Sequence, residues 1–309
     1  MIARRTMLAG LASVAAAPAM AQSWKSAFPE LVYAVVPAEN ASGVVNRFTP
    51  FTEYLARTLG TKVTLRVAND YAAVIEGQRA GNIHIGYHGP ASFSRALMTG
   101  VKIDAFVIDV NNDGSKGYYS VFYVRTDSPF QKLEDLKGKN LGLVDPNSGS
   151  GYNMPLYTLN KLGIEEAGKY FGKVVVTGSH ENAVIALADK TVDVCANWWN
   201  ADDDSNLTRM LGKNMLKKPD GGLMTKGDFR IVLKSELIMN SPTAMLSSLP
   251  ADLKKAIADA FLNAATADKE AFARLSDGKS KPWQAVDNAA YDETIKMVGF
   301  VDKLRRKAT

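Results

Sequence analysis

Apolar runs typical of strands alternate along this chain with segments of helical periodicity. The first part of the chain contains predicted strands at residues 31–37, 62–68 and 83–86, and predicted helices at residues 49–59, 71–80 and 90–100. Gly60 and Gly100 end two of these helices, as glycine commonly does just past a helix. Because such alternation is typical of βαβ units, the pattern predicts an α/β lobe built on a largely parallel sheet.

The same alternation starts again further along and predicts a second lobe. A β-rich run at residues 118–125 leads into the turn-forming segment 126–129. Beyond it we expect strands at residues 139–144, 174–178 and 192–196, and helices at residues 151–162 and 181–190. Residues 228–233 are a predicted return crossing, and the helices predicted at residues 251–274 and 288–304 should pack back on the first lobe.

These elements predict an α/β fold of two lobes joined by a two-stranded hinge. Lobe I would comprise residues 22–124 and 231–309, and lobe II residues 125–230. About 288 residues suffice for two lobes that each bury a core of their own. In open α/β sheets the ligand lies beyond the carboxyl ends of the strands, so we expect a binding cleft between the lobes.

The first 21 residues have the features of an export signal. Arg4 and Arg5 precede an apolar run at residues 7–17, and Ala-Met-Ala at residues 19–21 forms a small-residue cleavage site. This apolar run is shorter than the about 20 residues that a membrane span needs. A twin-arginine route and a general secretory route both fit the signal, and both predict a periplasmic protein.

Charge and cysteine content then narrow the function. The chain has 37 basic and 32 acidic residues, and removal of the signal with its two arginines leaves a net charge of +3. This mild excess suits small anions, while no basic run or stacking motif indicates nucleic-acid binding. Cys195 is the single cysteine, which excludes an internal disulfide, and with three histidines it gives no zinc pattern, so no metal or cofactor is expected.

Three strand-to-helix corners carry the candidate binding residues. The segment 145–151, Asp-Pro-Asn-Ser-Gly-Ser-Gly, offers hydroxyls and backbone N–H groups at the positive end of a helix, which suits an anion, although an ordinary capped turn has the same composition. His180, in the segment 179–182, lies at a second such corner, where a bound oxyanion would favour its protonated form; a structural histidine is the alternative. The third corner is the segment 87–92 with Tyr87 and His88, whereas His84 is expected to pack or to face solvent.

With these segments in place, the chain resembles the periplasmic phosphonate-binding proteins of phosphonate and phosphite ABC transporters, within the type II periplasmic-binding superfamily. The similarity extends over most of the chain, and the loop at residues 145–151 followed about thirty residues later by the histidine is its most specific part. The other matching segments are Pro50-Phe51, Asp70-Tyr71-Ala72, Tyr87-His88-Gly89, Asp113-Gly114-Ser115, Gly117-Tyr118, Asp127-Ser128-Pro129 and Val192-Asp193-Val194.

The resemblance implies which residues hold the phosphonate group. They are Ser148, the N–H of Gly149, Ser150 and His180, with Gly149 standing where the family often has threonine. His88 stands where the family has a tyrosine in the cleft. Further ligand contacts are expected at Tyr71, Tyr87, Asn197, Trp199, Asn200 and Ser241.

The resemblance also bears on the substituent of the ligand. Members that bind aminoalkyl phosphonates have two carboxylates for the ammonium group, and the matching positions here are Asn200 and Ser241. We therefore expect 2-aminoethylphosphonate to bind poorly, because no negative charge offsets the removal of water from its ammonium. Trp198 and Trp199 would narrow the pocket or pack in the core, and the acidic run at residues 202–204 is interpreted as a solvated helix start.

The predicted function is that of a solute-binding component of an ABC importer for a small phosphorus oxyanion. Phosphite, methylphosphonate, another phosphonate or phosphate would be captured by hinge closure, and a membrane permease would be the partner of a monomeric protein. An exported hydrolase such as a phosphatase is an alternative, but the chain has neither a nucleophile elbow nor a Walker motif. A ligand-sensing domain would use the same closure.

Overall fold

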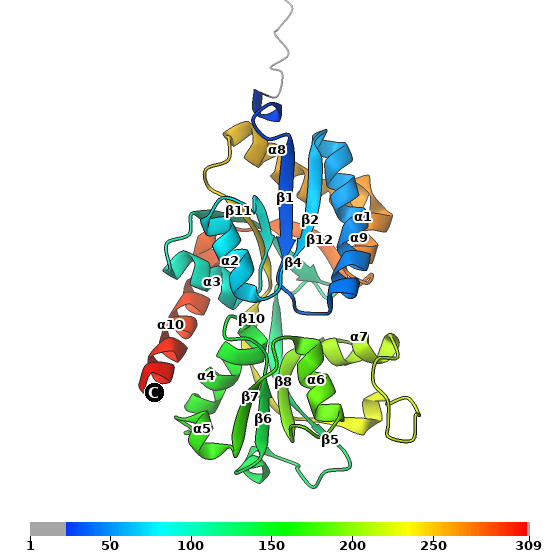
Figure 1. Cartoon of the computed structure of the whole chain (residues 1–309), viewed down its shortest axis with the longest axis vertical. Coiled ribbons are helices and arrows are strands. Elements are labelled where there is room, and N and C mark those ends of the chain that lie inside the picture. The colour runs from blue at the N-terminus through cyan, green and yellow to red at the C-terminus, as the bar shows by residue number, and fades with distance from the viewer. Residues whose placement is uncertain (1–22, 308–309) are drawn as a thin grey trace, which may run out of the picture.

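The computed structural model describes residues 23–307 and has two lobes stacked along its long axis (Figure 1). The predicted export signal at residues 1–21 lies outside the described residues. Lobe I, the upper lobe in Figure 1, contains β1 (Glu30–Val35), α1 (Ala41–Leu59), β2 (Lys62–Val67), α2 (Tyr71–Arg79), β3 (Ile85–Tyr87), α3 (Pro90–Met98), β4 (Ile103–Asn111), β11 (Pro242–Leu246), α8 (Ala251–Ala267), α9 (Lys269–Leu275) and β12 (Ser280–Ala285).

Lobe II lies between the two passages of the chain. It contains β5 (Gly117–Arg125), β6 (Asn140–Leu143), a π-helical turn (Gly149–Asn153), α4 (Met154–Lys161), α5 (Ala167–Tyr170), β7 (Lys173–Val176), α6 (His180–Ala188), β8 (Val194–Ala201), β9 (Asp204–Ser205), α7 (Asn206–Gly212) and β10 (Phe229–Met239). The last helix, α10 (Asp292–Lys307), follows a short 3-10 turn (Asn288–Tyr291). The prediction of a two-lobed α/β fold is confirmed.

Each lobe is built on a mixed sheet rather than on the largely parallel sheet that the sequence predicted. The strand order in lobe I is β12-β4-β11-β3-β1-β2, in which β1 runs parallel to β2 and β3 while β4, β11 and β12 pair in antiparallel fashion. The order in lobe II is β10-β5-β8-β6-β7, with β6 parallel to β7 and β8. The strands β4, β11 and β12 are not joined to a parallel neighbour by a crossover helix. The alternation of strands and helices along the sequence therefore did not predict them.

The chain passes between the lobes at positions other than the expected ones. Both β5 and β10 pair within the sheet of lobe II, where they form a long antiparallel ribbon. The first passage therefore falls between Asn111 and Gly117 rather than at residues 124 and 125, and the second falls at Asn240 and Ser241 rather than at residues 230 and 231. The sequence pattern predicts a strand at both places, but the lobe to which a strand belongs depends on the strands with which it pairs.

Three helices also differ from the sequence prediction. The helix α1 begins at Ala41, eight residues early, because the Asn40 side chain accepts a hydrogen bond from the Gly43 N–H and caps it. The helix expected at residues 251–274 is divided into α8 and α9, since Asp268 caps the second by accepting from the Ala271 N–H. The helix α7 was not predicted; it starts at Asn206 behind a Ser205 cap, just past the acidic run.

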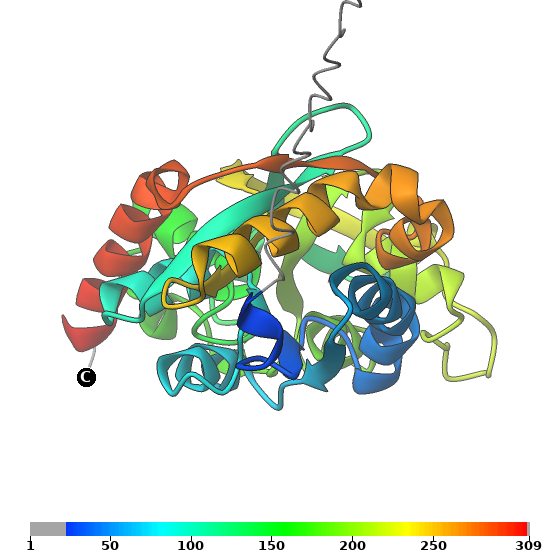
Figure 2. The same ribbon diagram turned by 90° about the horizontal axis from the view of Figure 1, so that it is seen from above.

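The helix α10 connects the two lobes instead of packing only on lobe I. It lies at one edge of the molecule, against α3 and α4 (Figures 1 and 2). Its Val298 and Val301 are buried in the hydrophobic cluster of lobe II. On the side of lobe I, Asp302 accepts two hydrogen bonds from Arg95 of α3, at 2.7 and 2.9 Å.

The core of lobe I follows from side-chain alternation along β1. Tyr33 points to one face of the sheet and packs edge-on against Phe51 of α1 and Phe261 of α8, whereas Val32 and Ala34 pack on the opposite face with Val74 of α2. Phe261 also contacts Trp283 of β12. Two helices from distant parts of the sequence thus share one aromatic core.

We expect Phe261→Ala to lower the free energy of unfolding by about 3–5 kcal/mol, because it opens a cavity in this core. Denaturant unfolding followed by tryptophan fluorescence measures the change. Phe300→Ala is the control, since Phe300 of α10 is 38% exposed and should tolerate truncation. Equal losses for the two variants would contradict the assignment of Phe261 to the core.

Candidate ligand-binding cleft

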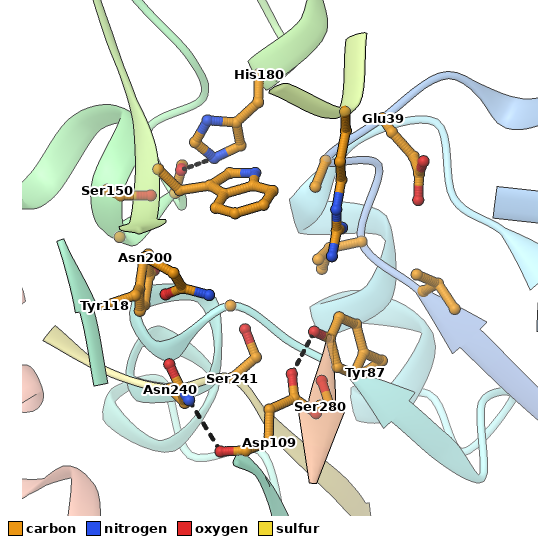
Figure 3. A pocket seen from close by; sticks show the side chains of 18 of the residues that line it. Glu39, Tyr87, Asp109, Tyr118, Ser150, His180, Asn200, Asn240, Ser241 and Ser280 are labelled. Atoms are coloured by element: carbon orange, nitrogen blue, oxygen red, sulfur yellow. Dashed lines mark hydrogen bonds between the residues drawn. The ribbon is translucent and has the colours of Figure 1, made fainter. Parts of the chain in front are cut away.

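A cavity of about 150 Å³ lies between the lobes and is lined by residues of both. Figure 3 shows its side chains converging from the strand-to-helix corners of the two lobes. Eight of the eleven predicted contacts line the cavity: Tyr71, Tyr87, Ser148, Gly149, Ser150, His180, Asn200 and Ser241. The remaining three, His88, Asn197 and Trp199, lie behind its wall.

The loop between β6 and α4 forms one end of the cavity. Ser148 is the N-cap of the π-helical turn, and its Oγ accepts a hydrogen bond from the Gly151 N–H at 3.1 Å. Ser148 and Ser150 are both buried. Because the first N–H groups of a helix have no partner within it, those of Gly149 and Ser150 are available to an anion in the cavity.

Two glycines are required by the close packing of this loop. A Cβ at Gly151 would lie 2.3 Å from Cγ2 of Val144 in the strand beneath, so the turn cannot hold a larger residue without moving. A Cβ at Gly149 would lie 3.1 Å from both Pro90 of lobe I and the hydroxyl of Tyr118. A larger residue at position 149 would require Pro90 or Tyr118 to shift by a few tenths of an ångström, so glycine favours the close approach of the two lobes.

His180 is positioned by a chain of three side chains. It is the first residue of α6, and its Nδ1 lies 3.0 Å from Oδ1 of Asn197, which can only accept. Nδ1 therefore carries the proton and Nε2 is an acceptor, at 3.2 Å from the Ser148 hydroxyl. Burial lowers the pKa of His180 to about 4, although the bond to Asn197 opposes this shift, so the imidazole is neutral in the absence of an anion.

Tyrosines complete the wall around this end of the cavity. Tyr71, the first residue of α2, is buried, and burial raises its pKa above the ordinary value. Burial also raises the pKa of Tyr118 to about 12. Both phenols therefore keep their protons at neutral pH and can donate hydrogen bonds to an oxyanion.

His88 does not reach the cavity, which corrects the prediction that it contacts the ligand. The strand β3 directs Tyr87 toward the cleft, and the next side chain points to the opposite face. There His88 is fully buried, with Nε2 2.7 Å from Oε1 of Gln78 and Nδ1 3.3 Å from the Ser92 hydroxyl. Burial lowers the pKa of His88 to about 3, so it acts as a neutral link between α2 and α3.

The same alternation along β8 corrects two further predictions. Trp198 and Asn200 lie on the face of the strand that lines the cavity. The guanidinium carbon of Arg209 lies over the Trp198 ring, 4.8 Å from the centre of that ring. Asn197 and Trp199 point to the other face. There Asn197 bonds to His180, while Trp199 stacks with Lys234, whose Nζ lies 4.1 Å from the indole.

The cavity is also lined by charged residues that were not among the contacts predicted from the sequence. Three carboxylates and three cations line the cavity: Glu39, Asp109, Asp204, Arg47, Arg209 and Lys279. Glu39 pairs with Arg47 at 2.5 Å. Asp109 accepts from the Tyr87 hydroxyl at 2.6 Å and from the Trp283 indole at 2.7 Å, and burial raises its pKa.

A signal for part of this set was present in the sequence. Glu39 and Arg47 flank the corner between β1 and α1, which is another strand-to-helix corner of the kind that marks the site. Asp109 lies in β4, a strand that the pattern missed. Asp204 is buried, whereas the acidic run at residues 202–204 had been interpreted as solvated.

Direct contacts hold the two lobes together around the cavity. The Glu181 carboxylate of lobe II accepts from the Asn40 backbone N–H at 2.7 Å and from its side-chain amide at 2.8 Å. Arg209 pairs with Asp277 at 3.2 Å, and Lys213 with Glu39 at 3.2 Å. The lobes are therefore in a closed arrangement in which the cavity has walls on both sides.

Comparison with known proteins identifies the family. Residues 33–291 match the model of the phosphonate periplasmic substrate-binding proteins of ABC transporters. This chain belongs to that family. Members of the family are substrate-binding proteins rather than enzymes, so the hydrolase alternative has no support, and the family places the chain in the periplasm.

Relatives and solved structures agree with this assignment. The chain is 31% identical over 250 residues to the phosphonates-binding periplasmic protein of Escherichia coli, covering 80% of this chain and 68% of that protein. It is 28% identical over 283 residues to a phosphate-import protein of Mycolicibacterium smegmatis, covering 86% and 84%. The fold matches that of a phosphonate transporter binding protein from Pseudomonas aeruginosa, with a TM-score of 0.75, 24% identity and coverage of 90% and 88%.

A further structural match is a binding protein from Prochlorococcus marinus in complex with methylphosphonate. It has a TM-score of 0.74 and 19% identity, and the match covers 89% of this chain and 99% of that one. Within residues 23–307, no group of three acidic, histidine or cysteine side chains is arranged to hold a metal ion. No helix in that range has the length and apolar content of a membrane span.

We expect the pKa of His180 to be about 4 without ligand and to rise when methylphosphonate binds, because a nearby anion stabilises the imidazolium. Nitrogen-15 NMR of the histidine rings measures both values. By linkage, affinity corrected for the protonation of the ligand itself should increase as the pH falls from the bound-state pKa toward 4.

His84 provides an internal control for this titration. It accepts a hydrogen bond from the Val32 N–H in lobe I, outside the cavity, so its pKa should be the same with and without methylphosphonate. An unchanged His180 pKa in the complex would show that the anion does not lie beside the imidazole.

Proposed function

We propose that this cleft captures a small phosphorus oxyanion, such as phosphite, methylphosphonate or phosphate, and presents it to a membrane permease. The proposal rests mainly on one observation. Ser148 and Ser150 of one loop and His180, thirty residues further along the sequence, lie together and buried at one end of a cavity that both lobes enclose. Few ligands other than a tetrahedral anion could use so many donors in so small a space.

The donors at this end match the needs of an oxyanion. The Ser150 hydroxyl, two helix N-terminal amides and the phenols of Tyr71 and Tyr118 belong to residues that line this end. The Ser148 hydroxyl donates to Nε2 of neutral His180, so protonation of His180 would free Ser148 to donate to the anion. Hydrogen bonds to a charged group in a dry cleft are charge-assisted and roughly twice as strong as neutral ones. A dissociation constant on the order of 1 μM, about −8 kcal/mol, is expected.

Hinge closure would be the means of capture. The first and second passages of the chain lie side by side, so lobe II can move relative to lobe I with changes confined to a few residues. Closure brings Tyr71 and Pro90 of lobe I against the anion-binding loop of lobe II. The closed pair of lobes would then be the form that the permease recognises, and a monomer is sufficient for this task. Export by a twin-arginine or a general secretory route would deliver the protein to the periplasm.

Titration calorimetry with phosphite, methylphosphonate, phosphate, sulfate and 2-aminoethylphosphonate tests the function. We expect the small phosphorus oxyanions to bind and 2-aminoethylphosphonate to bind more weakly, because Asn200 and Ser241 bring no charge to its ammonium and the carboxylates of the cavity already interact with Arg47 or Arg209. Binding of none of the phosphorus compounds would overturn the proposal, and tightest binding of the aminoalkyl compound would overturn the expected order.

Ser148→Ala should weaken methylphosphonate binding by about tenfold or more, since a hydrogen bond to a charged group contributes about 1.5–3 kcal/mol. Calorimetry gives the affinity, and a thermal melt shows whether loss of the helix cap has destabilised the fold. Ser94→Ala is the matched control, because Ser94 is also a buried serine but lies outside the cavity, and its hydroxyl has no hydrogen-bond partner within residues 23–307. Equal affinities for the two variants would remove Ser148 from the site.

Glu181→Gln should shift the protein toward an open arrangement, because a neutral amide is a weaker acceptor for the two Asn40 donors across the cleft. Small-angle X-ray scattering should show a larger radius of gyration, and ligand affinity should fall by about threefold to tenfold. Glu293→Gln, at an exposed position on α10, should change neither quantity. A compact variant with unchanged affinity would show that this contact does not govern closure.

A further inference from the structure

A network of amides at the other end of the cavity has a fixed polarity. The Asn111 amide donates both its hydrogens to the passage between the lobes, to the Ser115 hydroxyl and to the carbonyl of Gly117 at the start of β5. Its oxygen therefore accepts, from the Asn240 amide at 3.1 Å and from the Asn200 amide at 3.4 Å. The Asn240 amide donates its other hydrogen to the backbone carbonyl of Asp109, at 2.9 Å.

The orientation of the Asn200 amide follows from the same network. Its Nδ2 lies 2.9 Å from Oδ2 of Asp204, and an ionised carboxylate can only accept, so the amide nitrogen must face it. The amide oxygen of Asn200 is then turned away from both partners. Figure 3 shows the Asn200 side chain at the wall of the pocket, near Tyr118.

Two buried acceptors are left without a donor. Oδ1 of Asn200 and Oδ1 of Asp204 have no hydrogen-bond partner among the described residues, although Asp204 is only 8% exposed and both side chains line the cavity. Buried polar atoms are rarely left unpaired, because the loss of water is then uncompensated. The network thus directs its donors into the protein and leaves acceptors for a ligand.

The cavity has room for a ligand that reaches both ends. Its volume of about 150 Å³ corresponds to about ten water-sized positions. A phosphonate group has four heavy atoms, so a substituent of a few further atoms fits between the serines and Asn200. Phosphite or methylphosphonate would fill the donor end but would leave the two acceptors unpaired.

Among uncharged substituents, a hydroxyl can donate its one hydrogen to one of these acceptors, Asn200 Oδ1 or Asp204 Oδ1. An ammonium has three N–H donors and would find two free acceptors, one of which is a neutral amide. The other, Asp204, lies close enough to Arg209 to raise the pKa of that guanidinium, which burial lowers, so its charge is already in part compensated. A hydroxyl brings one donor and no charge, and it can also accept from a neighbour such as Ser241.

We propose that the Asn200–Asp204 end of the cavity binds a hydroxyl on the substituent of the ligand, and that the preferred ligands are short hydroxyalkylphosphonates. This inference rests on the proposed function, because it requires the phosphonate group at the serine end. It adds the chemical class of the substituent, which the oxyanion contacts alone do not determine.

Calorimetry with four compounds tests the inference. Methylphosphonate reports on the phosphonate end alone, 2-hydroxyethylphosphonate and propylphosphonate differ only in a hydroxyl against a methyl, and 2-aminoethylphosphonate carries the ammonium. We expect the hydroxyethyl compound to bind about tenfold or more tightly than the propyl compound, because the propyl group leaves both acceptors buried and unpaired.

Two variants separate the ends of the cavity. Asn200→Leu should reduce the hydroxyethyl-to-propyl affinity ratio to about twofold or less, since it removes one acceptor and the amide that orients the other. Ser148→Ala should weaken both compounds by a similar factor and keep the ratio. A thermal melt of each variant establishes that it is folded.

The outcomes distinguish the two proposals. If methylphosphonate binds and the ratio in the unmodified protein is near one, the hydroxyl inference is wrong and the proposed function stands. Tighter binding of the aminoethyl than of the hydroxyethyl compound also overturns the inference, in favour of an ammonium site. If the hydroxyethyl-to-propyl affinity ratio is unchanged in Asn200→Leu, the hydroxyl does not bind at the Asn200–Asp204 end of the cavity and the inference is wrong. If no phosphonate binds but phosphite or phosphate does, the hydroxyl inference fails and the proposed function stands; if none of these phosphorus compounds binds, both proposals fail.

Discussion

A tetrahedral oxyanion leaves water only when protein donors replace its hydration on every side, and this constraint organises the cleft. A single helix N-terminus offers donors from one direction. Here the corner at Ser148 and the start of α6 at His180 come from lobe II, while the start of α2 at Tyr71 comes from lobe I. These corners follow the parallel strands β2, β6 and β7 at facing sheet edges, and closure of the lobes brings them together.

Closure has its own electrostatic requirement, because it buries charged side chains along with the anion. Each carboxylate at the interface has a partner: Glu39 has Arg47, Asp277 has Arg209, and Glu181 has the two donors of Asn40. Balanced pairs of this kind contribute little stability, since desolvation offsets most of their attraction. They do allow the cleft to be polar and closed at the same time, and they leave the added charge of the anion to the donors at the serine end.

The cavity differs in polarity from one end to the other. Hydroxyls and amide N–H groups gather around Ser148 and Ser150, whereas the Asn111, Asn200 and Asp204 network presents oxygen atoms. This difference in polarity depends on two features outside the cavity. The strand β8 carries Trp198 and Asn200 on the same face, and hydrogen bonds to Ser115 and Gly117 fix the Asn111 amide where the chain leaves lobe I. The hinge region thereby takes part in forming the site.

The sequence by itself determined the features that depend on neighbouring residues. Alternating apolar runs predicted the two α/β lobes, and the loop at residues 145–151 together with His180 predicted the anion-binding end, because caps, glycine turns and helix starts are local. Only the tertiary structure decided what depends on pairing between distant segments. The antiparallel strands β4, β11 and β12 shift the lobe boundaries, and the register of β8 decides that Trp198 and Asn200 face the cavity while Asn197 and Trp199 do not. A displacement of one residue along a strand reverses its two faces. For that reason Asp204 at the tip of a hairpin, which is proposed to meet the substituent beside Asn200, could be found only in the folded protein.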